Sequence, residues 1–167
     1  FGVNPLRMFF LSASYNSTQT YSDDAIEEAL ERWDRLETAY DRMVSAVDSP
    51  DARTNVESPL RDAVEETHDS FTDAMNDDFN TREALAALFD LAAAANKHLD
   101  HAEEYDYRGL KRTVQTFETF GVEVCGFDFD GTAEGDATIA CELGELVLDV
   151  PETARETGHS EPAHELR

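Results

Sequence analysis

The most constraining feature of this sequence is a short polar junction, residues 76–80, between two amphipathic segments. Apolar residues recur at helical spacing on both sides of it. The upstream stripe ends with Phe71, Ala74 and Met75, and the downstream stripe contains Leu85, Leu88, Phe89, Ala92, Ala95, Asn96 and Leu99. Because so few residues separate the two stripes, the sequence predicts two helices packed as a hairpin.

The junction also carries turn and capping signals. Asp77 and Asp78 suit a turn, because short carboxylates bond to nearby backbone and tolerate unusual φ and ψ. Asn80 is a good helix N-cap, and Glu83 follows at the spacing of a capping box. We therefore expect a tight corner, with Phe79 inserted into the core.

The sequence around this corner resembles a known family. Residues 74–97, AMNDDFNTREALAALFDLAAAANK, are similar to the hallmark stretch of the helical domain of cysteinyl-tRNA synthetases. The family pattern is Ala-Met-x-Asp-Asp-Phe-Asn-Thr, followed by an acidic-Ala-Leu helix start. By this resemblance, Asp77, Asp78, Phe79 and Asn80 are structural residues of the motif.

Two flanking stretches extend the resemblance over nearly the whole chain. Near the start, the matching residues are Leu6-Arg7, Leu11-Ser12 and Tyr15, although Ser14 and Asn16 replace the family's His and Arg. Near the end, Ala154-Arg155 and Leu166-Arg167 match, whereas Ser160 and His164 depart from the pattern. The family's catalytic signatures would all lie upstream of Phe1, so we expect an excised piece of a longer protein.

The remaining sequence predicts an all-α fold, and the resemblance implies an antiparallel helical bundle of the DALR anticodon-binding type. Ser22 caps a long helix whose stripe includes Trp33, Pro59 opens another, and residues 108–120 form a further helix that stops at Gly121. A short first helix is expected with Asn4 as its N-cap and Pro5 in its first turn. Residues 121–136 break the helical period and predict an irregular or short β segment.

Three regions follow from this pattern. Residues 1–21 would join a missing catalytic domain to the bundle, residues 22–120 would form the bundle, and residues 121–167 would hold a loop and C-terminal helices at a truncated anticodon-binding end. The sequence has no run of apolar residues long enough to span a membrane, and it shows no secretory signal.

The charge balance is extreme, with 37 acids against 13 Lys plus Arg and a net charge of −24. Such a charge ordinarily opposes binding to nucleic acid. An acidic disordered tail is one alternative, but the acids are spread evenly among periodic apolar residues. Even spacing and scarce Lys favour adaptation to a very salty cytoplasm, where carboxylate repulsion is screened. The net charge therefore does not exclude RNA as a partner.

No pattern indicates catalysis or a metal site on this chain. Cys125 and Cys141 form no CxxC motif, and we expect buried or half-buried thiols. His98 and His101 lack convergent partners for a metal, and they more simply complement the dipole at a helix C-terminus. The resemblance implies ATP, magnesium and zinc for the missing catalytic domain, and no cofactor here.

The resemblance implies a cytoplasmic region that binds cysteine tRNA on its anticodon side and packs against its own catalytic domain, with no membrane or DNA partner. The best candidates for tRNA contacts are basic residues of the C-terminal half: Arg108, Lys111, Arg112, Arg155 and Arg167. The first three share one helical face, and salt bridges to neighbouring acids are the alternative for them.

A protein-interaction module without RNA function is the alternative for the whole chain. On the short first helix, Leu6, Phe9 and Phe10 would face a core, where the missing catalytic domain should dock. On the isolated region they would be its exposed apolar patch.

Overall fold

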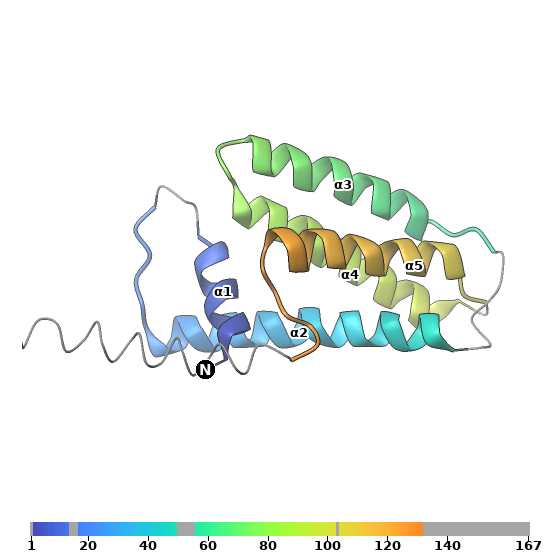
Figure 1. The fold of residues 1–167 in the computed structure, drawn as a ribbon, viewed down its shortest axis with the longest axis horizontal. Helices are drawn as coiled ribbons and strands as arrows, with labels where there is room; N and C mark the ends of the chain where they lie inside the picture. Colours follow the sequence, from blue (N-terminus) through green and yellow to red (C-terminus); the bar gives the residue numbers. More distant parts are fainter. Residues whose placement is uncertain (1, 14–16, 50–55, 103, 132–167) are drawn as a thin grey trace, which may run out of the picture. The chain divides into compact units, whose positions relative to one another are not determined.

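A computed structural model describes residues 2–13, 17–49, 56–102 and 104–131 of the chain (Figure 1). The chain divides into two compact units, Phe1–Gly131 and Thr132–Arg167, and every described residue lies in the first. The described part contains five α-helices and a short π-helix, with no strand. The all-α prediction is therefore confirmed. In these residues, no helix combines the length and apolar character needed to cross a bilayer.

The longest helix, α2 (Asp23–Asp48), runs along one side of the bundle (Figure 1). It begins as predicted, because the Ser22 side chain accepts a hydrogen bond from the Ala25 N–H at 3.2 Å. Two aspartates in its first turn favour the positive end of the helix dipole. Its apolar stripe is buried at Ile26, Ala29, Trp33, Leu36, Ala39, Tyr40 and Met43.

Helices α3 (Leu60–Asn76) and α4 (Thr81–His101) form the predicted hairpin and have the most extensive contact of any pair. In Figure 1, α3 lies on the opposite side of the bundle from α2, and α4 lies between them. Small residues on α4 allow close packing of the helices. The buried alanines of α4 are Ala84, Ala87, Ala92 and Ala95.

Helix α5 (Tyr107–Thr116) packs against both α2 and α3. The prediction that the helix stops at Gly121 is wrong, because the chain continues as π-helix η2 (Phe117–Val124). Gly121 is buried inside η2, where a Cβ atom would lie 3.0 Å from Cε2 of Phe129. The glycine is needed for close approach of an aromatic ring, and it is not a terminator.

Residues after η2 fold back across α2, as the orange segment of Figure 1 shows. Phe129 stacks on Tyr40 and Trp33, with ring centroids 4.3 and 5.1 Å away, and Phe127 lies 5.2 Å from Trp33. Both phenylalanines are buried. The prediction of an irregular or β segment is therefore wrong for residues 121–124, which are helical, and Gly121, Phe127 and Phe129 of this segment are buried. Trp33 is a core residue as expected.

Helix α1 (Val3–Leu11) packs across α2 and is joined to the returning segment. Gly2, not Asn4, is the N-cap. The Asn4 side chain donates to the Asp128 carbonyl at 2.7 Å and accepts from the Asp128 N–H at 3.0 Å. The predicted cap is wrong because the Asn4 amide pairs with backbone that is distant in sequence.

Candidate functional site

The corner between α3 and α4 is built largely as the sequence predicts. Asp77 ends α3, and Asn80 caps α4 by accepting the Glu83 N–H at 3.3 Å. The Asn80 N–H donates to the Ala74 carbonyl at 3.0 Å, which closes the turn. Asp78 has φ of 55°, in the left-handed region that Asp tolerates better than most residues.

Phe79 departs from the prediction. It also has positive φ, 54°, and its side chain is 63% exposed instead of being inserted into the core. The corner contains two successive left-handed residues, and Phe79 is exposed although Ala74 and Leu85 on either side of the corner are buried. A bulky side chain in this backbone region is uncommon. The corner thus displays an aromatic ring to solvent at some backbone cost.

Three of the predicted basic residues lie on α5. Arg108, Lys111 and Arg112 are all exposed. Arg112 forms an ion pair with Glu65 of α3, so the salt-bridge alternative holds for this residue. Arg108 and Lys111 have no ion pair or hydrogen bond within the described residues. The other two candidates, Arg155 and Arg167, lie outside the described residues.

A buried carboxylate fixes the start of α5. Asp106 is fully buried and caps the helix by accepting the Gly109 N–H at 2.9 Å. Arg61 donates to both of its oxygens, at 2.8 and 2.9 Å, and the Ser58 N–H and hydroxyl each donate at 3.1 Å. Burial raises the pKa of Asp106, but these donors outweigh it and lower the pKa to about 2.

Sequence reasoning missed this network. The local signal was present, because Asp106 stands three residues before Gly109 at the usual spacing of an N-cap and its acceptor bond. Arg61 could not have been found in this way, since 45 residues separate it from Asp106. Together they connect the start of α3 to the start of α5, which positions the basic face of α5.

The two histidines near the end of α4 lie in its last turn, as predicted. Nε2 of His98 accepts a hydrogen bond from the backbone N–H of Asp106 at 2.9 Å, so Nε2 carries no proton. Burial lowers the pKa of His98, and the nearby Asp106 carboxylate opposes this shift only in part. Within the described residues, no three His, Cys, Asp or Glu side chains are grouped so that they could hold a metal ion.

Cys125 is half-buried, in agreement with the expectation of a buried or half-buried thiol. Burial raises its pKa to about 11, so the thiolate, which is the reactive form, is scarce at neutral pH. Cys141 lies outside the described residues.

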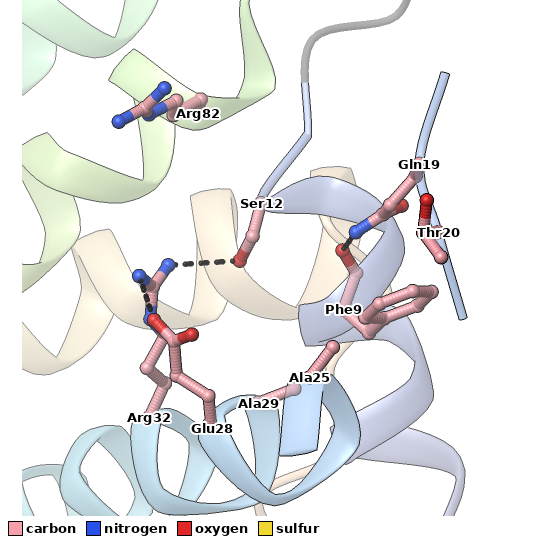
Figure 2. A pocket seen from close by; sticks show the side chains of 9 residues that line it. All are labelled: Phe9, Ser12, Gln19, Thr20, Ala25, Glu28, Ala29, Arg32 and Arg82. Atoms are coloured by element: carbon pink, nitrogen blue, oxygen red, sulfur yellow. Dashed lines mark hydrogen bonds and ion pairs between the residues drawn. The ribbon is translucent and has the colours of Figure 1, made fainter. Parts of the chain in front are cut away.

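A second basic group, which sequence reasoning missed, lies between α1, α2 and the start of α4. Arg32 and Arg82 line one cavity of about 240 Å³, and both also line an adjoining cavity of about 450 Å³ together with Arg35. Figure 2 shows Arg32 bonded to Glu28 and Ser12, with Arg82 extending from the neighbouring helix. These arginines come from separate helices, so periodicity alone could not bring them together.

The sequence of this bundle matches a known class of domain. Residues 70–129, which include the corner, α4, α5 and the returning segment, match the DALR domain family. The chain therefore contains a DALR domain, on which Arg108 and Lys111 are exposed.

Relatives specify the family further. The chain is 52% identical to a cysteine–tRNA ligase from Haloarcula marismortui, over 100% of this chain and 34% of the relative. It is 44% identical to the enzyme of that name from Halobacterium salinarum, over 99% of this chain and 34% of the relative. A cysteine–tRNA ligase from Moorella thermoacetica is 32% identical over 90% of this chain and 33% of the relative.

The chain belongs to the cysteine–tRNA ligase family, and it spans about a third of the length of these relatives. The suspected resemblance is therefore confirmed. The first two relatives come from halophilic archaea, which agrees with the high-salt interpretation of the acidic composition.

Proposed function

We propose that this chain is the tRNA-binding helical region of a cysteine–tRNA ligase. In this proposal it holds the anticodon side of cysteine tRNA, while a catalytic domain outside this chain joins cysteine to the acceptor end. Binding energy distant from the reacting atoms then positions the acceptor end for the chemical step. The supporting observation is the DALR domain in a chain related over its whole length to cysteine–tRNA ligases.

The α5 face is the first candidate for contact with the tRNA backbone. Arg108 and Lys111 are exposed and carry no ion pair in the described residues, so they can meet phosphate without first losing a partner. Arg112 would have to exchange Glu65 for phosphate. Arg155 and Arg167 remain candidates by family resemblance, with Arg155 able to bond a phosphate or a guanine edge in bidentate fashion.

We further propose that the parent ligase works in the cytoplasm, with ATP, magnesium and zinc bound by its catalytic domain. We propose no DNA or membrane partner. In the described part of this chain, no three His, Cys, Asp or Glu side chains are grouped so that they could hold a metal ion. The contribution of this chain is to bind and orient RNA.

Binding to two RNAs tests this function. The chain is mixed with a cysteine tRNA transcript and with a transcript carrying a changed anticodon, in molar potassium chloride. We expect tighter binding to the first, and discrimination that falls with Arg155→Ala. Arg108→Ala with Lys111→Ala should weaken both equally, because phosphate contacts carry no sequence information. Failure of the chain to bind either transcript would contradict the proposal.

Two exposed aromatic residues favour a second candidate, docking of a protein partner. Of the patch predicted at Leu6, Phe9 and Phe10, only Phe10 is exposed, at 67%; Phe9 is buried and Leu6 half-buried. Tyr21, 63% exposed, lies edge-on to Phe9. If this surface binds the catalytic domain, Phe10→Ser with Tyr21→Ser should abolish association with that domain and leave tRNA binding by the chain unchanged.

A further inference from the structure

The groove between α1, α2 and the first turn of α4 gathers arginines in a chain that has few basic residues. Its two adjoining cavities share Ser12, Arg32 and Arg82, and the larger one adds Arg35. Arg32 and Arg35 are three residues apart on α2, so they project from the same side of that helix. Arg82 lines both cavities from α4, and in Figure 2 its side chain extends from that helix above Arg32. Three of the 13 basic residues therefore converge on one groove.

Acids also line the groove, in the same number as the arginines, but within the described residues only Arg32 forms an ion pair with one of them. Glu28 bonds to Arg32 at 2.7 Å. Glu83 and Asp90 lie on the ridge that this groove shares with a second one, between α3 and α4. The second groove contains Glu66 as well and is lined by no Lys or Arg. Basic side chains thus distinguish the arginine groove from its neighbour.

The stability of the fold does not explain why an arginine occupies position 82. It is in the first turn of α4, where the helix dipole opposes a cation. Within the described residues it has neither an ion pair nor a hydrogen bond, although the chain contains 37 acids that could have supplied one. A residue that breaks a local rule without a visible gain in stability is a candidate for function.

Arg35 is similarly available. Its guanidinium lies over the Phe89 ring, 5.8 Å from the centroid, and forms no ion pair in the described part of the chain. The ring supports the flat guanidinium from one side while its N–H groups stay free to donate. Arg32 is oriented by Glu28 and by the Ser12 hydroxyl, which it reaches at 3.3 Å.

We propose that Arg35 and Arg82, with Arg32 beside them, bind the phosphate backbone of the RNA. This inference rests on the proposed function and adds a second contact region, on elements other than α5. Guanidinium groups bind phosphate in bidentate fashion through parallel N–H donors. The larger cavity, about 450 Å³, is within the range of sites that hold small ligands.

The test compares two double variants with equal changes in charge. Arg35→Gln with Arg82→Gln removes two arginines from the groove. Arg42→Gln with Lys97→Gln removes two cations from the same helices, α2 and α4, outside the groove. Each variant of the 167-residue chain is titrated with the cysteine tRNA transcript across a potassium chloride series, with helicity checked by circular dichroism. A poly-glutamate peptide is the second probe.

The groove variant should bind tRNA roughly tenfold or more weakly, because charge-assisted hydrogen bonds are lost. Its plot of log affinity against log salt should be less steep by ~0.7–0.9 for each phosphate contact removed. The control variant should keep the wild-type slope. Equal slopes in both variants would overturn the proposal. Loss of poly-glutamate binding with tRNA binding intact would also overturn it, since the occupant would then be an acidic protein segment.

The same titrations separate this inference from the proposed function. If the wild-type chain binds tRNA and only Arg108→Ala with Lys111→Ala weakens this binding, the groove proposal fails and the proposed function stands. If only the groove variant weakens binding, the groove is right and the α5 contacts are wrong. If wild-type chain binds no RNA, both proposals fail.

Discussion

At the scale of single residues, Asp106 has the most consequential environment in the described chain. It is a fully buried carboxylate whose bonds to Arg61, Ser58 and Gly109 leave neither oxygen unpaired. Replacing one partner of such a network leaves buried donors facing each other, and this costs more than the net worth of the original bonds. Stability should therefore respond to Asp106 much more than to exposed carboxylates.

We expect Asp106→Asn to lower the free energy of unfolding by about 2–3 kcal/mol at neutral pH. The new amide group would direct N–H donors at Arg61 or Ser58, which themselves donate. Urea unfolding in molar potassium chloride measures the effect. Asp100→Asn is the control, because Asp100 pairs with Arg42 at an exposed site and should cost less than ~1 kcal/mol. Equal effects would contradict the role of the buried network.

The lowered pKa of Asp106 also predicts acid sensitivity. Because its folded pKa is about 2, below the ordinary 3.8, its stabilisation is complete above pH 4. As the pH falls from 3.8 to about 2, the unfolded chain binds the proton before the folded chain does, so the free energy of unfolding decreases progressively. The Asp106→Asn variant should lack this part of the acid-induced decline. Parallel pH profiles of variant and wild type between pH 4 and 2 would show the assignment to be wrong.

Substitution of Phe79 should stabilise the fold, because the backbone conformation at this position is unfavourable for a bulky residue. Its φ is 54° and its side chain is mostly exposed, so little apolar burial offsets the strain. Phe79→Asn should stabilise the fold by about 0.5–1 kcal/mol, since Asn visits the left-handed region more easily. Thermal unfolding provides the measurement, and Phe10→Asn is the comparison, exposed but in a normal helix. A clear loss of stability in Phe79→Asn would mean that the ring supports the corner.

At the scale of elements, α5 depends on a glycine for its capping. A Cβ atom at position 109 would lie 2.8 Å from Oδ2 of Asp106, closer than atoms can pack. Replacing glycine by alanine within a helix ordinarily stabilises the fold by about 0.5–1 kcal/mol. Gly109→Ala should instead destabilise the chain, by about 1–3 kcal/mol. Gly2→Ala, where the nearest atom is 3.7 Å away, is the matched control, and similar melting temperatures for the two variants would refute the clash.

The elements also show which structure can be predicted from the sequence. The starts of α2 and α4 were predictable, because Ser22 and Asn80 act on amides only three residues away. Helix periodicity located the hairpin for the same reason. The continuation through Gly121 was not predictable, since it depends on Phe129 packing there from a later segment. Nor was the arginine groove, which combines residues from α2 and α4. Local signals were correct at Ser22 and Asn80, but at Asn4 and Gly121 contacts with a distant segment overrode them.

At the scale of the whole molecule, the net charge of −24 sets the conditions under which the chain folds. Like charges on a compact surface repel one another, and this repulsion favours the expanded state. In ~1 M salt the Debye length is ~3 Å, whereas at ~0.1 M it is ~10 Å, so neighbouring carboxylates interact much more strongly at low salt.

We therefore expect the bundle to loosen at low salt, with a lower melting temperature and reduced cooperativity. For a chain of this size each kcal/mol lost lowers the melting temperature by about 2–4 °C. Circular dichroism across a potassium chloride series measures this. A variant with Glu27, Glu31 and Asp34 of α2 changed to Gln or Asn removes three exposed negative charges, and it should depend less on salt than wild type. Full helicity and unchanged cooperative melting of the wild-type chain at low salt would mean that packing alone holds the bundle together.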